Sequence, residues 1–506
     1  MPAPVRSIRR VATLVLAPVL VVAACSNGPT APRSAAPITV PAITREFRGM
    51  WIATVANIDW PASAGLSVGA QQAGFTQLMD AAERTGLNAV VLQVRAAGDA
   101  MYASSLEPWS RSLTGTQGAD PGYDPLAYAL QESHARGLEL HAWFNPFRAG
   151  NLSDTLTLAA THFARRRPDL ARRYCSQLWF DPGEQEVQDH AIAVILDVVR
   201  RYGVDAVQID DYFYPYPNTS CPGLDFPDST AYARFVNGGG SLGRAEWRRD
   251  NVNRFVQRLY TEVRAASATV RVGISPFGIW RPGNPAGIVG LDAYASIYAD
   301  SRLWLQRGWL DYFAPQLYWS INSSGQSFPL LLGWWMQQNT QRRHLWPGLA
   351  SYRVADGTGS AFAAAEIPSQ VGLARQQSTQ AGGASGTILY NASSVRADRG
   401  GFATALASGL YAQRALPPAT TWLDATAPAP PFFTVSVSRG AAQVAIADGA
   451  DAYWWLVRWR ADGAWSQRLV PAAQRSVTIT TPNVDGVVVT AVDRVGNTSA
   501  DAIWQP

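Results

Sequence analysis

The feature that most constrains the fold is an alternation, from Phe47 to about Leu410, of short apolar runs with longer stretches of helical periodicity. Short apolar runs bounded by turn residues indicate buried strands, and their alternation with helices is typical of parallel βα units. Eight runs have the length of strands: Arg48–Thr54, Ala89–Arg95, Glu139–Asn145, Ala206–Asp210, Val272–Ser275, Tyr312–Tyr318, Leu345–Ala350 and Thr387–Asn391. Helical patterns lie between them, for example at Pro125–Arg136, Glu184–Tyr202 and Trp247–Ala265.

Eight βα units predict an α/β fold of the (β/α)8 TIM-type barrel kind, in which parallel strands close into a ring inside a layer of helices. An open doubly wound sheet is the alternative. Such sheets commonly bind nucleotides through a glycine-rich loop after a strand, and no loop of that kind follows any of the eight runs. The barrel is therefore favoured.

The strands share one pattern of side chains. Successive residues of a strand point to opposite faces, and in four of the runs one face is wholly apolar while the other becomes polar towards the C-terminal end. The apolar face is expected on the helix layer and the polar face in the barrel lumen, opening at the end where barrel enzymes carry their chemistry. The expected luminal residues are Val91, Gln93 and Arg95; His141, Trp143 and Asn145; Gln208 and Asp210; and Gln316 and Tyr318.

Two adjacent carboxylates, Asp210 and Asp211, end the fourth run, and the aromatic loop YFYPYP follows them. A buried carboxylate is costly unless it is paired or functional. Strand alternation places Asp210 in the lumen and Asp211 on the opposite face, unless the strand has already ended. We therefore expect direct chemistry from Asp210 and support of the loop from Asp211.

Composition excludes several classes of function. The chain of 506 residues has a net charge of +4 and no lysine, which rules out a Schiff-base lysine and a Walker A lysine. It shows no basic stripe, so we expect no nucleic-acid partner. The five histidines have no metal-binding spacing and no serine-hydrolase elbow is present, so neither a metal nor a cofactor is expected. A Mg²⁺ or Ca²⁺ ion at the paired aspartates is the remaining metal alternative.

The N-terminus has the pattern of an export signal. Arg6, Arg9 and Arg10 precede an apolar stretch that is too short to span a bilayer comfortably. Val22–Cys25 resembles a bacterial lipobox, which predicts a signal peptide over 1–24, a lipid anchor on Cys25 and a Pro/Ala-rich tether over 25–44. The protein would then be a lipoprotein of the cell envelope, facing the periplasm or outer membrane in a Gram-negative cell. An ordinary secretory signal with an incidental cysteine is the alternative.

Export implies an oxidising compartment. Cys175 and Cys221 flank the strand that ends at Asp210, and they either form a disulfide that joins the loops around it or remain free thiols.

After the predicted barrel, the sequence pattern changes from alternating strands and helices to short strands alone. The barrel is expected over 45–415, a Pro/Ala/Thr-rich linker over 416–431, and a small all-β sandwich over 432–506, where short alternating runs are separated by turn residues. The closing segment VVVTAVDRVGNTS resembles the end of a fibronectin type III-like domain.

A series of motifs carries a family resemblance. They are EFRGMWIATVANIDWP (46–61), VLQVRAAGDAMY (91–102), LTGTQGADPGYDPL (113–126), HAWFNPFR (141–148), WFDPGEQEV (179–187), QIDDYFYP (208–215), WRRDNVNRFV (247–256), GISPFGIWRPG (273–283) and DYFAPQLYW (311–319). In this order they resemble the glycosyl hydrolase-like family 10 of bacteria, over roughly three-quarters of the chain. Leu389-Tyr390-Asn391 departs from the pattern of that family.

The resemblance implies a TIM-type barrel in an exported or lipid-anchored protein, and hydrolysis of a polysaccharide, with peptide-free peptidoglycan strands as the expected substrate. The residues on or near the family motifs are Asp99, Asn145, Arg148, Asp210, Asp211, Trp280, Asp300, Gln316 and Tyr318. Guanidinium groups and aromatic faces at the rim suit carboxylates and sugar rings. The expected substrate contacts are Arg95, Asp99, Asn145, Arg148, Tyr212, Trp280, Gln316 and Tyr318.

Glycosidases generally use two carboxyl groups. We expect Asp210 as nucleophile or base, with Asp211 and Asp300 as the further catalytic candidates. Asp99 and Glu184 remain alternatives for the general acid. A glycan-binding envelope lipoprotein without catalysis is the alternative function, and a structural envelope protein acting through the β-sandwich is a third.

Overall fold

The computed structural model describes residues 38–438, 440–447 and 451–506, and its main compact unit runs from Val40 to Pro506. The predicted signal peptide and lipobox cysteine lie outside the described residues. All eight predicted runs contribute to one parallel sheet. In chain order its strands are β1 (Phe47–Ile52), β2 (Ala89–Arg95), β3 (Glu139–Phe144), β7 (Ala206–Ile209), β8 (Arg271–Ile274), β9 (Tyr312–Phe313), β10 (His344–Leu345), β11 (Gly348–Leu349) and β12 (Gly386–Leu389).

The sheet closes because β10 and β11 are two halves of one strand. β10 pairs with β9, β11 pairs with β12, and β12 pairs with β1, all in parallel. Trp346 and Pro347 lie between the halves, and the ladder continues through them, since Trp346 N donates to Phe313 O (2.9 Å) and Ile388 N donates to Pro347 O (3.1 Å). The prediction of a (β/α)8 barrel is confirmed, and the open sheet is excluded.

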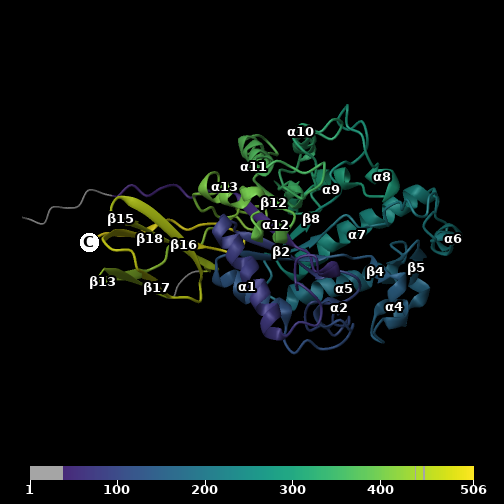
Figure 1. Cartoon of the computed structure of the whole chain (residues 1–506), viewed down its shortest axis with the longest axis horizontal. Helices are drawn as coiled ribbons and strands as arrows, with labels where there is room; N and C mark the ends of the chain where they lie inside the picture. The colour runs from purple at the N-terminus through teal and green to yellow at the C-terminus, as the bar shows by residue number, and fades with distance from the viewer. Residues whose placement is uncertain (1–37, 439, 448–450) are drawn as a thin grey trace, which may run out of the picture. The chain divides into compact units, whose positions relative to one another are not determined.

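Helices surround the strands (Figure 1). The longer ones are α1 (Val68–Thr85), α3 (Pro125–Ala135), α5 (Gln185–Arg201), α6 (Ser229–Asn237), α7 (Arg244–Ala266), α9 (Ser301–Arg307), α10 (Phe328–Gln338), α11 (Glu366–Gln376) and α13 (Phe402–Ser408). Short helices are α2 (Arg111–Thr114), α4 (Phe163–Arg166), α8 (Ala293–Ser296) and α12 (Ala392–Arg396). A small antiparallel sheet of β4 (Arg148–Asn151), β6 (Gln177–Phe180) and β5 (Ala171–Tyr174) is inserted between β3 and α5.

Local sequence explains where these helices begin and end. Asp124 caps α3 by accepting a hydrogen bond from Ala127 N (2.9 Å), and Pro125 follows at the first helical position, where a missing N–H costs nothing. α1 ends at Gly86, whose φ of 83° is the left-handed conformation that glycine adopts without strain.

The two faces of the strands belong to two separate apolar clusters. Val90, Leu92, Leu140 and Val207 pack into the large cluster that the helices share. Their neighbours on the opposite face pack into a second cluster in the lumen, formed by Phe47, Trp51, Ala53, Ala89, Val91, Trp143, Ala206, Tyr312, Ala314, Trp346 and Ile388. The predicted alternation between helix layer and lumen is therefore confirmed for these strands.

Aromatic rings fill the lower lumen. Phe47 and Trp346 stack with centroids 3.7 Å apart, and Tyr312 stacks on Trp346 at 4.6 Å. Gly273 makes room for Tyr312, because a Cβ at this position would lie 1.9 Å from the phenol ring. The lumen is a packed core and not a channel, as is usual for barrels of this size.

Charged groups at the N-terminal end of the barrel are paired. Glu139, at the start of β3, forms an ion pair with Arg271 (2.7 Å) and contacts His141 (3.1 Å). Asp205, just before β7, contacts His134 Nε2 (2.9 Å) and accepts a hydrogen bond from Leu140 N (2.8 Å). These buried groups therefore have partners that compensate their charge.

The C-terminal strands form a sandwich of two antiparallel sheets. One sheet has the order β13 (Phe433–Ser438), β14 (Ala441–Ile446), β17 (Ser476–Ile479). The other has the order β16 (Ala464–Pro471), β15 (Trp454–Ala461), β18 (Val484–Val492), β19 (Ala502–Trp504). Val444, Val477, Trp455 and Val487 come from both sheets and share one apolar core. The predicted all-β sandwich is confirmed.

The segment predicted as a linker makes specific contacts with the barrel. Trp422 Nε1 donates to Asp311 Oδ1 (2.9 Å), and Thr420 Oγ1 lies 3.2 Å from His344 Nε2. Asp311 and His344 stand at the N-terminal ends of β9 and β10, so this segment packs at the end of the barrel away from Asp210.

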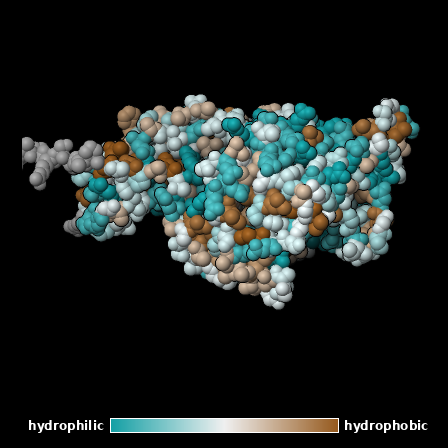
Figure 2. Space-filling model, turned by 90° about the horizontal axis from the view of Figure 1, so that it is seen from above, coloured by the Kyte–Doolittle hydropathy of each residue, from teal (hydrophilic) through white to brown (hydrophobic). Residues whose placement is uncertain are grey.

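On the face seen in Figure 2, hydrophobic residues form scattered patches among hydrophilic ones. The most exposed large apolar side chains, Leu156 and Phe432, lie far apart in the sequence. Within the described residues, no helix has the length and apolarity needed to cross a membrane.

Candidate active site

The two predicted acids lie together in one cavity at the C-terminal ends of the strands. The cavity has a volume of about 180 Å³ and is lined by Trp51, Trp143, Gln208, Asp210, Asp211, Tyr212, Ser275, Gln316, Tyr318 and Tyr390. Strand β7 ends at Ile209, so strict alternation stops before the two acids. Of the two alternatives for Asp211, the structure has the one in which the strand has already ended, and Asp211 lines the same cavity as Asp210.

Neutral donors hold the carboxylate of Asp210. Trp143 Nε1 (3.1 Å) and Asn145 Nδ2 (2.5 Å) both donate to Oδ2, and Tyr212 N donates to Oδ1 (3.3 Å). Asn145 is itself oriented by Gln93, whose Nε2 donates to Asn145 Oδ1 (2.6 Å). Strands β2, β3 and β7 thus fix the position of Asp210 through a chain of hydrogen bonds.

Asp211 is held by a hydroxyl from its own loop. The hydroxyl of Tyr216, in the loop after β7, donates to Asp211 Oδ2. The side chain of Gln316, which follows β9, also favours the charged form of this carboxylate, while its Nε2 donates to Ser275 O (3.0 Å). Neither partner carries a positive charge.

Burial beside a second acid changes the protonation of Asp210. Removal from water and then the charge of Asp211 raise the pKa of Asp210 from 3.8 to about 7, although Tyr212 N, Arg148 and Asn145 favour the charged form. Burial also raises the pKa of Asp211, although the side chains of Tyr216 and Gln316 favour its charged form. A carboxyl group that titrates near neutral pH can act as a general acid and as a base.

Aromatic rings form much of the cavity wall. Tyr318 and Tyr390 stack with centroids 5.7 Å apart, and Trp51 meets Tyr390 edge-on at 6.2 Å. Flat apolar faces beside carboxylates and amides suit a sugar ring, which has apolar C–H faces and a polar edge. Tyr212, Gln316 and Tyr318 were predicted here, and all three line the cavity.

Arg148 and Asp99 lie next to this cavity. Both line a second cavity of about 260 Å³, and the guanidinium of Arg148 stands over the Tyr212 ring, 4.9 Å from its centroid. Since Tyr212 lines the Asp210 cavity, Arg148 stands where the two cavities adjoin.

The structure gives Arg95 a different position from the one predicted. The pairing of β2 with β3 shifts register between Gln93 and Arg95, and an irregularity of this kind redirects the side chain. Arg95 forms a buried ion pair with Glu107 (2.6 Å), which His190 also contacts (2.9 Å). It does not line the Asp210 cavity and serves as a structural ion pair.

Asp300 and Trp280 lie together but outside the Asp210 cavity. Asp300 caps α9 by accepting a hydrogen bond from Leu303 N (3.3 Å), and Trp280 Nε1 donates to the same oxygen (3.1 Å). Glu184, an alternative acid, pairs with Arg172 (2.9 Å) and Arg234. These positions do not bring a third carboxylate to Asp210.

Sequence reasoning missed several residues of the site. Trp143 and Gln208 were assigned to the lumen but not to the site, although alternation puts them on the same face as Asp210. Tyr216 stands in a loop without periodicity, Ser275 is the last residue of the fifth predicted run, and Tyr390 lies in the motif that departs from the family. No sequence signal indicates the contact of Tyr216 with Asp211.

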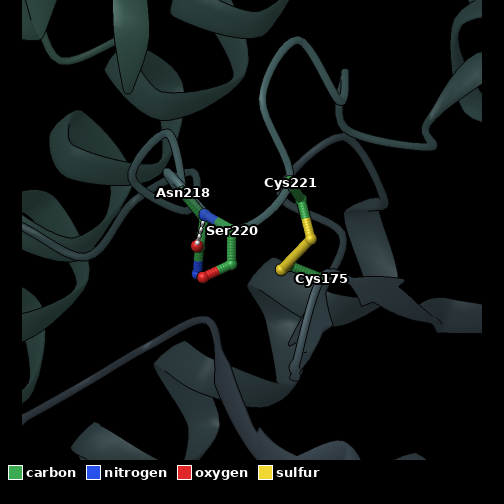
Figure 3. Close-up of a disulfide and its surroundings, with 4 residues drawn as sticks. All are labelled: Cys175, Asn218, Ser220 and Cys221. Atoms are coloured by element: carbon green, nitrogen blue, oxygen red, sulfur yellow. Dashed lines mark hydrogen bonds between the residues drawn. A yellow bond between two sulfur atoms is a disulfide. The ribbon is translucent and has the colours of Figure 1, made fainter.

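A disulfide joins Cys175 to Cys221 (Figure 3), with an S–S distance of 2.07 Å. It links the β5–β6 turn to the loop that carries Tyr216. Asn218 accepts a hydrogen bond from Ser220 N (2.8 Å) beside it. Of the two alternatives left open, paired or free thiols, the structure has the disulfide.

Within the described residues, no group of three or more histidine, cysteine or acidic side chains is arranged to hold a metal ion. Asp210 and Asp211 are therefore not joined by a third such ligand.

Comparison with known proteins places the chain in a family. Residues 46–362 match the family described as glycosyl hydrolase-like 10. The chain is 40% identical to glycosyl hydrolase YngK of Bacillus subtilis, covering 77% of this chain and 76% of that protein. It is 35% identical to glycosyl hydrolase DigH of Escherichia coli K12, covering 69% of this chain and 84% of that protein.

Among solved structures, the glycoside hydrolase domain of PgaB from Bordetella bronchiseptica matches with a TM-score of 0.47 and 14% identity. The match covers 74% of this chain and the whole of that domain. From the family match and the identity to its curated relatives, the chain belongs to the glycosyl hydrolase-like 10 family and is a glycosidase.

Proposed function

We propose that the protein hydrolyses glycosidic bonds in peptidoglycan strands that have lost their peptides, with Asp210 as the group that transfers protons. One observation carries this proposal: a buried carboxyl group with a pKa of about 7 lies beside a second carboxyl group in an aromatic-walled cavity at the catalytic end of the barrel. The resemblance of the motifs to the family supports the choice of glycan.

The geometry suits acid catalysis first. Below pH 7 Asp210 keeps its proton, which it gives to the leaving-group oxygen as the glycosidic bond breaks. Water then bonds to the anomeric carbon, and the Asp210 carboxylate takes the proton that this water loses. Asp211 shares the cavity and, when charged, stabilises positive charge that develops on the sugar ring. A cavity with two carboxyl groups favours hydrolysis over binding alone, which is the alternative function.

The test is product analysis. Purified protein without residues 1–24 and with Cys25 replaced is incubated with amidase-treated glycan strands, and separately with strands that keep their peptides. Mass spectrometry should show products that have gained one water per cleavage, mainly from the peptide-free strands. Binding without cleavage would contradict the proposal and support the non-catalytic alternative.

Two variants assign the chemistry. Asp210→Asn should lower kcat/KM by about 10²- to 10⁴-fold, the usual contribution of general acid–base catalysis. Asp300→Asn is the matched control, because asparagine caps a helix as well as aspartate does and Asp300 does not line the cavity. Full activity of a folded Asp210→Asn protein would refute the assignment.

We also propose that the protein is an exported lipoprotein of the cell envelope. The lipobox at Val22–Cys25 and the Cys175–Cys221 disulfide support this location. Labelled palmitate should enter the wild-type protein and not Cys25→Ala. Equal labelling of both would show that Cys25 is not the anchor.

A further inference from the structure

The second cavity contains an arginine that has no partner. Arg148 begins β4 and is half-buried in the cavity wall. Its guanidinium is held over the Tyr212 ring, yet no described residue accepts a hydrogen bond from it or forms an ion pair with it. Arg111, in the same cavity, is different, since it pairs with Asp154 (2.7 Å) and donates to Thr157 (3.0 Å). Arg148 is therefore the cation in this cavity that remains available to a ligand.

A second group in the same cavity also lacks a partner. Asp99 is 3% exposed, and its Oδ2 accepts a hydrogen bond from Gln117 Nε2 (3.2 Å). Its Oδ1 is buried without any hydrogen-bond partner. A buried acceptor left without a donor is costly, so this oxygen is suited to a donor that a ligand brings.

We propose that this cavity is a glycan subsite in which Arg148 binds the free carboxylate of an acidic sugar, next to the site of bond cleavage. The inference rests on the proposed function, and in that substrate the carboxylate belongs to the lactyl group of muramic acid. The planar guanidinium matches a carboxylate through two parallel hydrogen bonds, and stacking on Tyr212 limits its rotation. Asp99 Oδ1 accepts a hydrogen bond from a hydroxyl or amide N–H of the same sugar.

This subsite gives a physical reason for preferring strands without peptides. A peptide joins the lactyl carboxyl through an amide bond, which removes the negative charge that Arg148 would bind. The guanidinium then faces a neutral carbonyl group and loses the charge-assisted pair.

The test compares two substrates that differ only at this carboxyl group, which is charged in one and neutral in the other. One is amidase-treated glycan strands, and the other is the same strands after the lactyl carboxylates are converted to methylamides. The wild-type protein should cleave the acidic strands with a kcat/KM about 10- to 100-fold higher, the range expected for a hydrogen bond to a charged group. In Arg148→Gln that ratio should fall to near one.

The ratio separates recognition from catalysis. Arg148 also lowers the pKa values of Asp210 and Asp211, so its loss changes the rate on both substrates, whereas only a subsite changes their ratio. Asp99→Asn should lower kcat/KM on both substrates and leave the ratio intact. Arg166→Gln is the matched control, because Arg166 also stands over a ring, that of Phe163, but lines neither cavity.

Each outcome has one meaning. A wild-type protein that cleaves both substrates equally overturns the inference and leaves the proposed function in place. No cleavage of either substrate overturns the proposed function itself. If Arg148→Gln does not fold, Arg148→Lys keeps the charge without the planar fork and should retain only part of the preference. A preference unchanged in the folded Arg148 variant would refute the subsite.

Discussion

Asp205 and Asp210 stand at the two ends of strand β7, and each is 4% exposed. Burial raises the pKa of Asp205, but His134, Leu140 N and Arg271 outweigh it and bring the pKa to about 2. Burial and the neighbouring Asp211 raise the pKa of Asp210 to about 7. Equal burial thus gives opposite protonation behaviour.

The difference lies in the partners. At the N-terminal end, acids meet His134, Arg271 or backbone N–H groups, which stabilise their charged forms. At the C-terminal end, Asp210 meets the neutral side chains of Trp143 and Asn145 and a second acid. At one end of the strand, paired charges stabilise the fold. At the other end, an acid can give up and recover a proton near neutral pH.

Substituting the two acids should separate their roles most strongly. Asp205→Asn removes a charged partner and should lower the free energy of unfolding by about 1.5–3 kcal/mol at pH 7 while the folded protein stays active. Asp210→Asn should abolish most activity without a comparable loss of stability. Urea denaturation gives the free energy of unfolding of both variants, and kinetics give their kcat/KM. If folded Asp205→Asn lost activity while Asp210→Asn kept it, the roles assigned to the two acids would be wrong.

The pH dependence of stability should have opposite signs for the two acids. The lowered pKa of Asp205 means that its charge stabilises the fold above pH 3.8, and this contribution is lost as pH falls towards 2. The raised pKa of Asp210 means that its ionisation opposes folding from pH 3.8 upwards, until the cost is complete above pH 7. The free energy of unfolding of Asp210→Asn, relative to that of the wild type, should therefore be higher at pH 8 than at pH 4.

Removing the disulfide tests whether a covalent bond stabilises the C-terminal end of the barrel as ion pairs stabilise the N-terminal end. The Cys175→Ser, Cys221→Ser double variant should lower the free energy of unfolding by about 4 kcal/mol or less, the chain-entropy value for cysteines 46 residues apart. We also expect lower kcat/KM, because the freed loop carries Tyr216. Reducing the wild type should reproduce both effects and leave the variant unchanged. Unaltered activity would show that Tyr216 keeps its place without the disulfide.

The pH profile of activity sharpens the role of Asp211. Because Asp210 must be protonated to act as an acid, kcat/KM should fall above about pH 7. The charge of Asp211 raises the pKa of Asp210, so in the residual activity of Asp211→Asn this alkaline limb should move to lower pH. Asp300→Asn should not move it. A shift to higher pH would reverse the assignment of the two acids.

The smallest effect is expected from Tyr216→Phe, which removes the hydroxyl that donates to Asp211. Loss of one hydrogen bond to a charged group should lower kcat/KM by about 10-fold. Tyr232→Phe is the control, since its hydroxyl bonds to the carbonyl of Leu242 away from the cavity. Equal kcat/KM values for the two variants would show that the Tyr216 hydroxyl does not contribute to activity.

The sequence predicts the barrel well because a period of two residues determines which face of a strand is apolar. That rule places Gln208, Gln316 and Tyr318 correctly and brings Asp210 to the rim. It fails where a strand is irregular or finished: the register shift redirects Arg95, and the end of β7 brings Asp211 beside Asp210. Asp300 and Trp280 sit on family motifs, yet motif position does not reveal that the acid caps a helix.

The two-residue period of strands does not predict which loop residues contact one another. Arg148 meets Tyr212 only because the barrel brings β4 beside the loop after β7, and Tyr216 meets Asp211 because that loop turns back between these two residues. No periodicity in the sequence specifies these distances.

The stacked rings of Phe47, Trp346 and Tyr312 have a consequence for turnover. They seal the barrel below Asp210, so water and protons reach this acid from the rim side, through the opening that the glycan also occupies. In the mechanism proposed above, Asp210 gives its proton to a leaving sugar and would recover one only as that sugar moves aside. Reprotonation is thereby tied to product departure, and a slowly leaving product would delay both.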